Sequence, residues 1–245
     1  MHQQQEEVIR KLQGYQPSEQ AQELIRTTSV VLLVGISGAG KDTIKHHLLT
    51  DAPGYRHIVS HTTRAPRANN GVMETDGVDY HFIDWSKAAE MVDAQEFIEA
   101  KIYAGNLYGT STTDIQLAKQ HGETAITALE VQGVEEYKKI SSSVKAIFLL
   151  PPSYAVWQER YRKRYGGKFG EHSEDIQRRM QTALIELNLA LTDGFFTFVV
   201  NDHLAGTVKA VDAVARGQQV DDQGQAKQLV HELISELSRT VNRQA

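Results

Sequence analysis

The stretch VLLVGISGAGKDT, residues 31–43, decides the fold. It opens with a short run of branched apolar residues, which is typical of a buried parallel strand. The turn from Gly35 to Lys41 then matches the pattern GxxxxGK, and the residues after it have helical spacing. In that order, strand, turn and helix present backbone N–H groups and a positive helix end to phosphate oxygens. We therefore predict a nucleotide-binding phosphate loop in which Lys41 neutralises phosphate charge.

Asp42 departs from this pattern, because Ser or Thr usually follows the lysine and holds Mg²⁺. Three interpretations are open. Thr43 supplies the hydroxyl one residue later, or Asp42 contacts the metal directly or through water, since Mg²⁺ prefers oxygen ligands. The third, which we favour, is that Asp42 points away as an acid in the first helical turn, where the helix dipole stabilises it.

Strands and helices alternate along the rest of the chain, which predicts an α/β fold with a mainly parallel sheet flanked by helices. Five segments read as strands, and the expected strands are SVVLLVG (29–35), HIVSHTT (57–63), TAITALE (124–130), VKAIFLL (144–150) and FFTFVV (195–200). Residues 64–84 read as an irregular excursion, and the helix after them is expected to take Ser86 as its N-cap.

The two ends of the chain are polar. Residues 1–28 read as a helical leader, with Pro17-Ser18 as a break and expected cap between two helical stretches, and 218–245 read as a linker followed by a helix. A leader of this kind is usually a surface helix or a frayed tail. The segment 29–217 between them is expected to be the main domain.

Composition excludes several functions. The chain has no cysteine, so disulfides and thiol catalysis are excluded. A net charge of −5 gives no broad basic field for nucleic acid or a membrane surface. The absence of a signal-like segment and of long apolar runs makes the cytoplasm the expected location.

Several further motifs follow the loop in order: SHTTRAPR (60–67), DGVDYHF (76–82), EFIEAKIYAGNLYGTS (96–111) and ALEVQG (128–133). Together with the loop, they closely resemble the guanylate kinase family over about residues 31–202. The resemblance implies a P-loop nucleoside monophosphate kinase with a GMP-binding subdomain near 60–112 and a lid near 160–178. It implies transfer of the ATP γ-phosphoryl group to GMP, with Mg²⁺ accompanying ATP. Use of dGMP and the oligomeric state stay open.

The resemblance also implies roles for individual residues. The ATP site would comprise Gly35, Ser37, Gly38, Ala39, Gly40, Lys41, Asp42, Thr43 and Asn201. The GMP phosphate would be held by Ser60, Arg64, Arg67, Tyr80 and Tyr108, and the guanine edge read by Glu99, Thr110 and Glu130. Lys41 and the lid arginines Arg160, Arg164 and Arg179 would neutralise charge during transfer.

The chemistry of guanine supports this assignment independently. Its N1–H and 2-amino groups are adjacent donors that one carboxylate can accept, and O6 accepts a hydrogen bond from a threonine hydroxyl. Adenine lacks N1–H, so a buried acid would be left poorly paired against it. We therefore expect Glu99 to select guanine.

Ala128 departs from the family, in which two acids usually flank an apolar residue at the end of this strand. Only the second acid is kept, as Glu130. The change bears on turnover more than on binding. We link it to Asp42 as a hypothesis in which one carboxylate has moved from the strand end to the phosphate loop.

Two alternatives are weighed. Related P-loop kinases that act on a sugar phosphate such as ribose 1,5-bisphosphate can carry the sequence GKD at the loop. A guanylate-kinase-like module that has lost catalysis and binds a protein partner is the other. Glu99 and Thr110 argue against the first alternative, whereas Lys41 and the lid arginines argue against the second.

Overall fold

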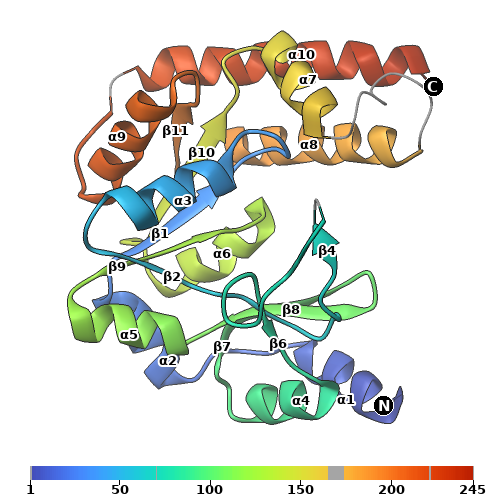
Figure 1. Cartoon of the computed structure of the whole chain (residues 1–245), viewed down its shortest axis with the longest axis vertical. Coiled ribbons are helices and arrows are strands. Elements are labelled where there is room, and N and C mark those ends of the chain that lie inside the picture. The colour runs from blue at the N-terminus through green and yellow to red at the C-terminus, as the bar shows by residue number, and fades with distance from the viewer. Residues whose placement is uncertain (1, 70, 165–173, 221, 245) are drawn as a thin grey trace. The chain divides into compact units, whose positions relative to one another are not determined.

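The computed structural model describes residues 2–69, 71–164, 174–220 and 222–244. The chain divides into two compact units. We call residues 31–53, 128–134 and 145–245 the phosphate-loop unit, and residues 1–30, 54–127 and 135–144 the hairpin unit. Figure 1 labels the helices and strands of both.

The phosphate-loop unit is built on three parallel strands in the order β11-β10-β1. They are β1 (Val30–Val34), β10 (Lys145–Leu150) and β11 (Phe196–Val200). Its helices are α3 (Lys41–Asp51), α7 (Tyr154–Arg164), α8 (Glu174–Thr192), α9 (Leu204–Ala215) and α10 (Gln223–Gln244). Every residue of β1 is buried, as predicted for a central strand.

The C-terminal helix α10 lies alongside α7 and α8 (Figure 1). Val230, Leu233 and Leu237 on its inner face are almost fully buried. At its start, the side-chain amide of Gln223 donates to the Phe198 carbonyl at 3.0 Å and accepts from the Phe198 N–H at 2.9 Å. The helix is therefore attached directly to the outer strand β11.

The hairpin unit contains a parallel pair, β2 (Tyr55–His57) with β9 (Thr124–Ala128), and a four-stranded sheet in the order β6-β3-β8-β7. The sheet strands are β3 (His61–Thr62), β6 (His81–Phe82), β7 (Phe97–Tyr103) and β8 (Asn106–Ser111). A small hairpin joins β4 (Ala68–Asn69) to β5 (Val72–Met73). The helices of this unit are α1 (His2–Leu12), α2 (Glu19–Thr27), α4 (Trp85–Asp93) and α5 (Thr113–His121). Helix α6 (Val131–Ile140) begins in the other unit and ends in this one.

The α/β class with parallel strands and flanking helices is confirmed. The sequence did not predict the β7–β8 hairpin, α5 or α6. The irregular excursion at 64–84 contains three short strands.

One of the two predicted helix N-caps is confirmed, and the other is wrong. Ser18 caps α2 as predicted, accepting the Ala21 N–H at 3.2 Å. The prediction for Ser86 was wrong: Asp84 caps α4 and accepts the Lys87 N–H at 2.8 Å. An acid two residues earlier competes well for this position, because aspartate is among the best N-caps.

No helix among the described residues is long and apolar enough to cross a membrane.

Candidate functional site

The glycine turn joins β1 to α3, and two of its glycines are required by geometry. Gly40 has a φ of 97° as the N-cap of α3, and a Cβ there would lie 2.3 Å from Nδ2 of Asn201. A Cβ on Gly35 would lie 2.4 Å from the carbonyl oxygen of Leu149. Positive φ and close approach both favour glycine. The loop is therefore packed tightly against the ends of β10 and β11.

Lys41 is the first residue of α3, and its ammonium group folds over the loop. Its Nζ donates to the carbonyl of Gly35 at 2.5 Å and lies 3.4 Å from the carbonyl of Ile36. The positive charge is thus held at the mouth of the glycine turn, where the loop is predicted to bind phosphate.

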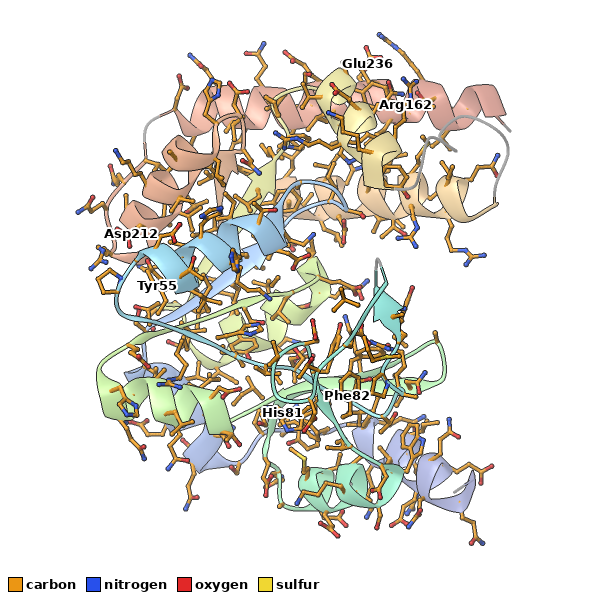
Figure 2. The ribbon with its side chains drawn as sticks, in the orientation of Figure 1. Tyr55, His81, Phe82, Arg162, Asp212 and Glu236 are labelled. Atoms are coloured by element: carbon orange, nitrogen blue, oxygen red, sulfur yellow. The ribbon has the colours of Figure 1, made fainter. Side chains whose placement is uncertain are left out.

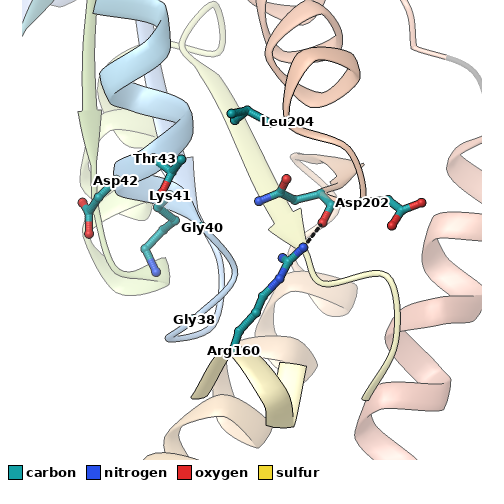
Figure 3. Close-up of a pocket in the computed structure, with 9 residues that line it drawn as sticks. Gly38, Gly40, Lys41, Asp42, Thr43, Arg160, Asp202 and Leu204 are labelled. Carbon is teal, nitrogen blue, oxygen red and sulfur yellow. Dashed lines mark hydrogen bonds between the residues drawn. The ribbon is translucent and has the colours of Figure 1, made fainter. Parts of the chain in front are cut away.

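A cavity of about 400 Å³ opens beside the loop (Figure 3). The residues that line it are Gly38, Gly40, Lys41, Asp42, Thr43, Arg160, Asn201, Asp202 and Leu204. Asp42 and Thr43 are exposed, and the Asp42 carboxylate points away from Arg160 in Figure 3. This is the orientation favoured for a first-turn acid. The cavity is therefore lined by two cations, Lys41 and Arg160, and by the acids Asp42 and Asp202.

Arg160 and Asn201 connect α7, β11 and the loop. Arg160 donates through Nη2 to the carbonyl of Asn201 at 2.8 Å, whereas its Nη1 is buried without a hydrogen-bond partner among the described residues. Asn201 is itself buried, and its Nδ2 donates to the carbonyl of Ala39 at 2.8 Å. The asparagine amide thus holds the phosphate loop. A contact of Asn201 with adenine stays a prediction.

Trp157 gives the loop a second attachment. Its ring is 1% exposed, and its Nε1 donates to the carbonyl of Ser37 at 2.8 Å. Trp157 lies on α7, one turn before Arg160. One helix therefore fixes the loop and carries a predicted catalytic arginine.

The other two lid arginines are placed only in part. Arg164 is the last residue of α7, and its side chain lies outside the description. Arg179 is partly buried on α8. The predicted lid at 160–178 includes residues 165–173, which lie outside the described residues.

The predicted GMP phosphate ligands cluster in the hairpin unit. The Arg64 guanidinium makes a two-point pair with Glu74, at 2.8 and 3.0 Å, and its Nε donates to the Tyr108 hydroxyl at 3.1 Å. The Arg64 carbon Cζ lies 5.3 Å from the centre of the Tyr80 ring. Arg67 is more exposed, with its Nε 3.6 Å from the same Glu74 carboxylate.

The Glu74 carboxylate fixes the orientation of Arg64. The hydrogen bonds from Arg64 lower the pKa of Glu74 and raise that of Arg64. Ser60, the fifth predicted ligand, precedes β3, and its carbonyl accepts the His81 N–H at 2.9 Å. The structure therefore gathers Tyr80, Tyr108 and the Glu74 carboxylate around the Arg64 guanidinium.

The predicted guanine readers also meet. Glu99 is buried, and its Oε1 lies 3.1 Å from both the N–H and the hydroxyl of Thr110. The Thr110 hydroxyl is 2.7 Å from that of Tyr137, which is fully buried. Burial, followed by the negative charge of Glu99, raises the pKa of Tyr137 far above its usual value, so this phenol stays protonated. Glu130, the third predicted reader, lies in the phosphate-loop unit and is exposed two residues after β9.

Two histidines of the hairpin unit, His61 and His81, pack against each other. The rings of His61 and His81 are 4.6 Å apart, and His61 also packs edge-on against Phe97. Figure 2 labels His81 beside Phe82 on β6. Burial, with the nearby His81, lowers the pKa of His61 to about 4. His61 is therefore neutral at physiological pH.

Sequence reasoning missed three of these residues. Glu74 and Trp157 belong to none of the motifs, and Tyr137 lies on a helix that was not predicted. A half-polar aromatic that is predicted to be buried needs a partner for its N–H or O–H. For Trp157, this need for a hydrogen-bond partner was the only signal in the sequence that could have indicated its role.

The comparisons agree with the geometry. The family model described as guanylate kinase matches residues 27–218. A guanylate kinase of Trichodesmium erythraeum is 35% identical over 190 residues, covering 78% of this chain and 97% of that protein. One from Schizosaccharomyces pombe is 34% identical over 186 residues, covering 75% and 88% respectively.

A structural comparison supports the fold. The crystal structure of guanylate kinase from Anaplasma phagocytophilum has a TM-score of 0.56 and 24% identity, over 80% of this chain and 89% of that one. The match at residues 27–218 includes both clusters described above. The chain therefore belongs to the guanylate kinase family.

Proposed function

We propose that this chain is an ATP:GMP phosphotransferase, which transfers the γ-phosphoryl group of ATP to GMP and releases ADP and GDP. The observation that carries the proposal is the buried pair of Glu99 and Thr110. A buried carboxylate needs donors, and guanine supplies two adjacent ones. Family membership and the names of the relatives support the same reaction.

The phosphate loop would bind ATP through its main-chain N–H groups. Lys41 would exchange its contacts with loop carbonyls for the β- and γ-phosphates. The Nη1 of Arg160, which has no partner in the described part of the chain, would donate to a phosphate oxygen. Transfer of a phosphoryl group leaves little covalent work for the protein, so positioning and charge neutralisation supply the rate. Arg164 and Arg179 are proposed to contribute to the same neutralisation.

GMP would bind with its phosphate against Arg64, Arg67, Ser60 and the two tyrosine hydroxyls. Because Glu74 already holds Arg64 in a two-point pair, the guanidinium is oriented before the nucleotide arrives. Glu99 and Thr110 would read the guanine edge, with Glu130 as a further acid. The assay that tests the proposal also includes dGMP, the deoxyribose form of GMP.

Mg²⁺ is the proposed cofactor. We expect the ion to arrive with ATP, because Mg²⁺ is usually held by one or two protein ligands together with substrate phosphates. The cavity offers the Thr43 hydroxyl and the Asp42 carboxylate, and oxygen ligands of this kind fit Mg²⁺. When bound, the ion would neutralise charge on the phosphates. The cytoplasmic location stays a prediction from the sequence.

A coupled assay of ADP formation tests the proposal. GMP, dGMP, AMP and ribose 1,5-bisphosphate are supplied in turn with ATP and Mg²⁺. We expect kcat/KM for GMP to exceed that for AMP by at least about 10²-fold, because AMP cannot offer the Glu99 carboxylate the two adjacent donors of guanine. Turnover of ribose 1,5-bisphosphate without GMP would favour the sugar-phosphate kinase. If the protein phosphorylates none of these substrates but binds a phosphopeptide tightly, the protein-binding module would be favoured.

A further inference from the structure

The N-terminal segment packs into the hairpin unit, although the family match begins only at residue 27. Val8 of α1 is fully buried in one core cluster with residues of α4, β7 and β8. Ile25 of α2 is also fully buried. The leader therefore forms surface helices that pack one face onto the unit that carries the predicted GMP ligands, and it is not a frayed tail.

Tyr15, between α1 and α2, contacts the main chain of β7. Its hydroxyl donates to the carbonyl of Phe97 at 2.9 Å and accepts from the N–H of Phe97 at 3.0 Å. The N–H of Ser18 adds a third bond, to the carbonyl of Gln95 at 3.3 Å. Among the described residues β7 is the outer strand of its sheet, so the Phe97 groups have no neighbouring strand on that side to pair with. The leader takes the place of that strand.

The contact lies at an irregularity of the sheet. Phe97 pairs with Ser111, whereas Glu99 pairs with Thr110, so two steps along β7 match one step along β8. Such a bulge redirects the side chains that follow it. Here it sends Phe97 into the core while Glu99 meets Thr110. A one-residue change in pairing would turn the Glu99 carboxylate to the other face of the sheet.

We propose that Tyr15 is a positioning residue for guanine recognition: its hydroxyl fixes the β7 main chain at the bulge and so aims Glu99. The inference rests on the proposed function. Tyr15 bonds both polar backbone groups of Phe97, two residues from Glu99, so a shift of this segment would break both bonds. Burial raises the pKa of Tyr15 to about 12, which keeps the donor proton in place.

The test is Tyr15→Phe, which keeps the ring and removes only the hydroxyl. Inosine monophosphate is the second substrate, because it lacks the 2-amino group that a well-aimed carboxylate accepts. We expect kcat/KM for GMP to fall about tenfold, as two backbone hydrogen bonds are lost. The value for inosine monophosphate should fall less, so the preference for GMP narrows. The KM for ATP should be unchanged.

Lys11→Gln is the matched control. It removes an exposed ion pair between α1 and Asp93 of α4, in the same segment but away from β7. This variant should keep the wild-type preference for GMP over inosine monophosphate. The same narrowing in Lys11→Gln would mean that docking of the leader matters and Tyr15 has no specific part.

An unchanged preference in Tyr15→Phe would overturn the inference while leaving the proposed function intact. Failure of the wild-type protein to phosphorylate GMP would instead overturn the proposed function. Hydrogen exchange provides a readout without turnover, since the amides of Phe97 and Glu99 should exchange faster in Tyr15→Phe. If Tyr15→Phe folds poorly, the exchange rates are measured at low temperature on the fraction that stays native. Equal exchange rates of the Phe97 and Glu99 amides in wild type and variant would contradict the inference.

Discussion

The two predicted substrate regions of this chain are built in opposite ways. The phosphate loop is one continuous stretch, and its shape depends on main-chain geometry at Gly35 and Gly40. The guanine cluster is assembled from side chains on separate elements, with Glu99 on β7, Thr110 on β8 and Tyr137 on α6. The first region is predicted to recognise a feature that all nucleoside triphosphates share. The second is predicted to distinguish one base from another.

This difference suggests a division of work between backbone and side chains. Main-chain N–H groups can bind phosphate without requiring particular side chains, because every residue except proline carries one. Selection of a base needs donors and acceptors at fixed places, which only particular side chains supply. Damage to the loop should therefore stop the reaction altogether, whereas damage to the cluster should change which substrate is used.

Lys41→Ala should have the largest effect. Removal of the ammonium group from the glycine turn should lower kcat by roughly 10³-fold, because charge on the transferred group is left unneutralised. Circular dichroism should show an unchanged fold. Steady-state turnover close to wild type would contradict the assignment of the loop.

His61 should make the hairpin unit sensitive to acid. The unfolded state takes up a proton near pH 6.5, but the folded state does so only near pH 4, so stability is lost as the pH falls through this window. The loss should reach about 3 kcal/mol, at 1.36 kcal/mol for each pKa unit. Urea unfolding between pH 7 and pH 4 measures it.

His61→Phe should remove most of this dependence, since a phenyl ring can fill the space against Phe97 and His81. Substitution of His46, which is exposed on α3, is the control and should leave the acid curve as in the wild type. Equal slopes for wild type and His61→Phe would show that other groups cause the acid loss.

Glu99→Gln should raise the KM for GMP by roughly 30-fold, or about 2 kcal/mol, and leave the KM for ATP unchanged. The amide keeps the oxygen that accepts from Thr110 but replaces an acceptor with a donor facing guanine. Glu96→Gln, an exposed acid nearby, is the control. An equal rise for both nucleotides would mean that Glu99 does not read the base.

Trp157→Phe should have the smallest effect. Loss of the bond from Nε1 to the Ser37 carbonyl is worth about 1 kcal/mol, so we expect the KM for ATP to rise about fivefold. Trp85→Phe, on α4 of the hairpin unit, is the matched control and should leave the KM for ATP unchanged. If the two variants behaved alike, the loop would not depend on Trp157.

The predictability of the two regions follows from the same contrast. The loop was readable because strand, glycine turn and lysine are contiguous, and each residue type has a physical reason at its position. Glu99 and Thr110 became readable only through several motifs in register. Nothing local to Tyr137 or Glu74 announces a role, since their partners lie 27 and 10 residues away.

The polar leader illustrates a further limit. Val8 and Ile25 stand among glutamines and glutamates, and their helical spacing is equally typical of a surface helix. Whether such apolar residues become buried depends on apolar residues of α4 and β7, which are distant in sequence. The error at Ser86 has a local cause instead, because Asp84, an equally good N-cap, stands two residues earlier.

The amide of Gln223 has a practical consequence. It occupies both the N–H and the carbonyl of Phe198 on the outermost strand of the phosphate-loop unit. Recombinant protein that ends at residue 218, where the family match ends, would lose this cover together with α10 but keep the N-terminal leader. The bared strand would be a template for pairing with other molecules, so we expect the shortened protein to precipitate where the full chain does not.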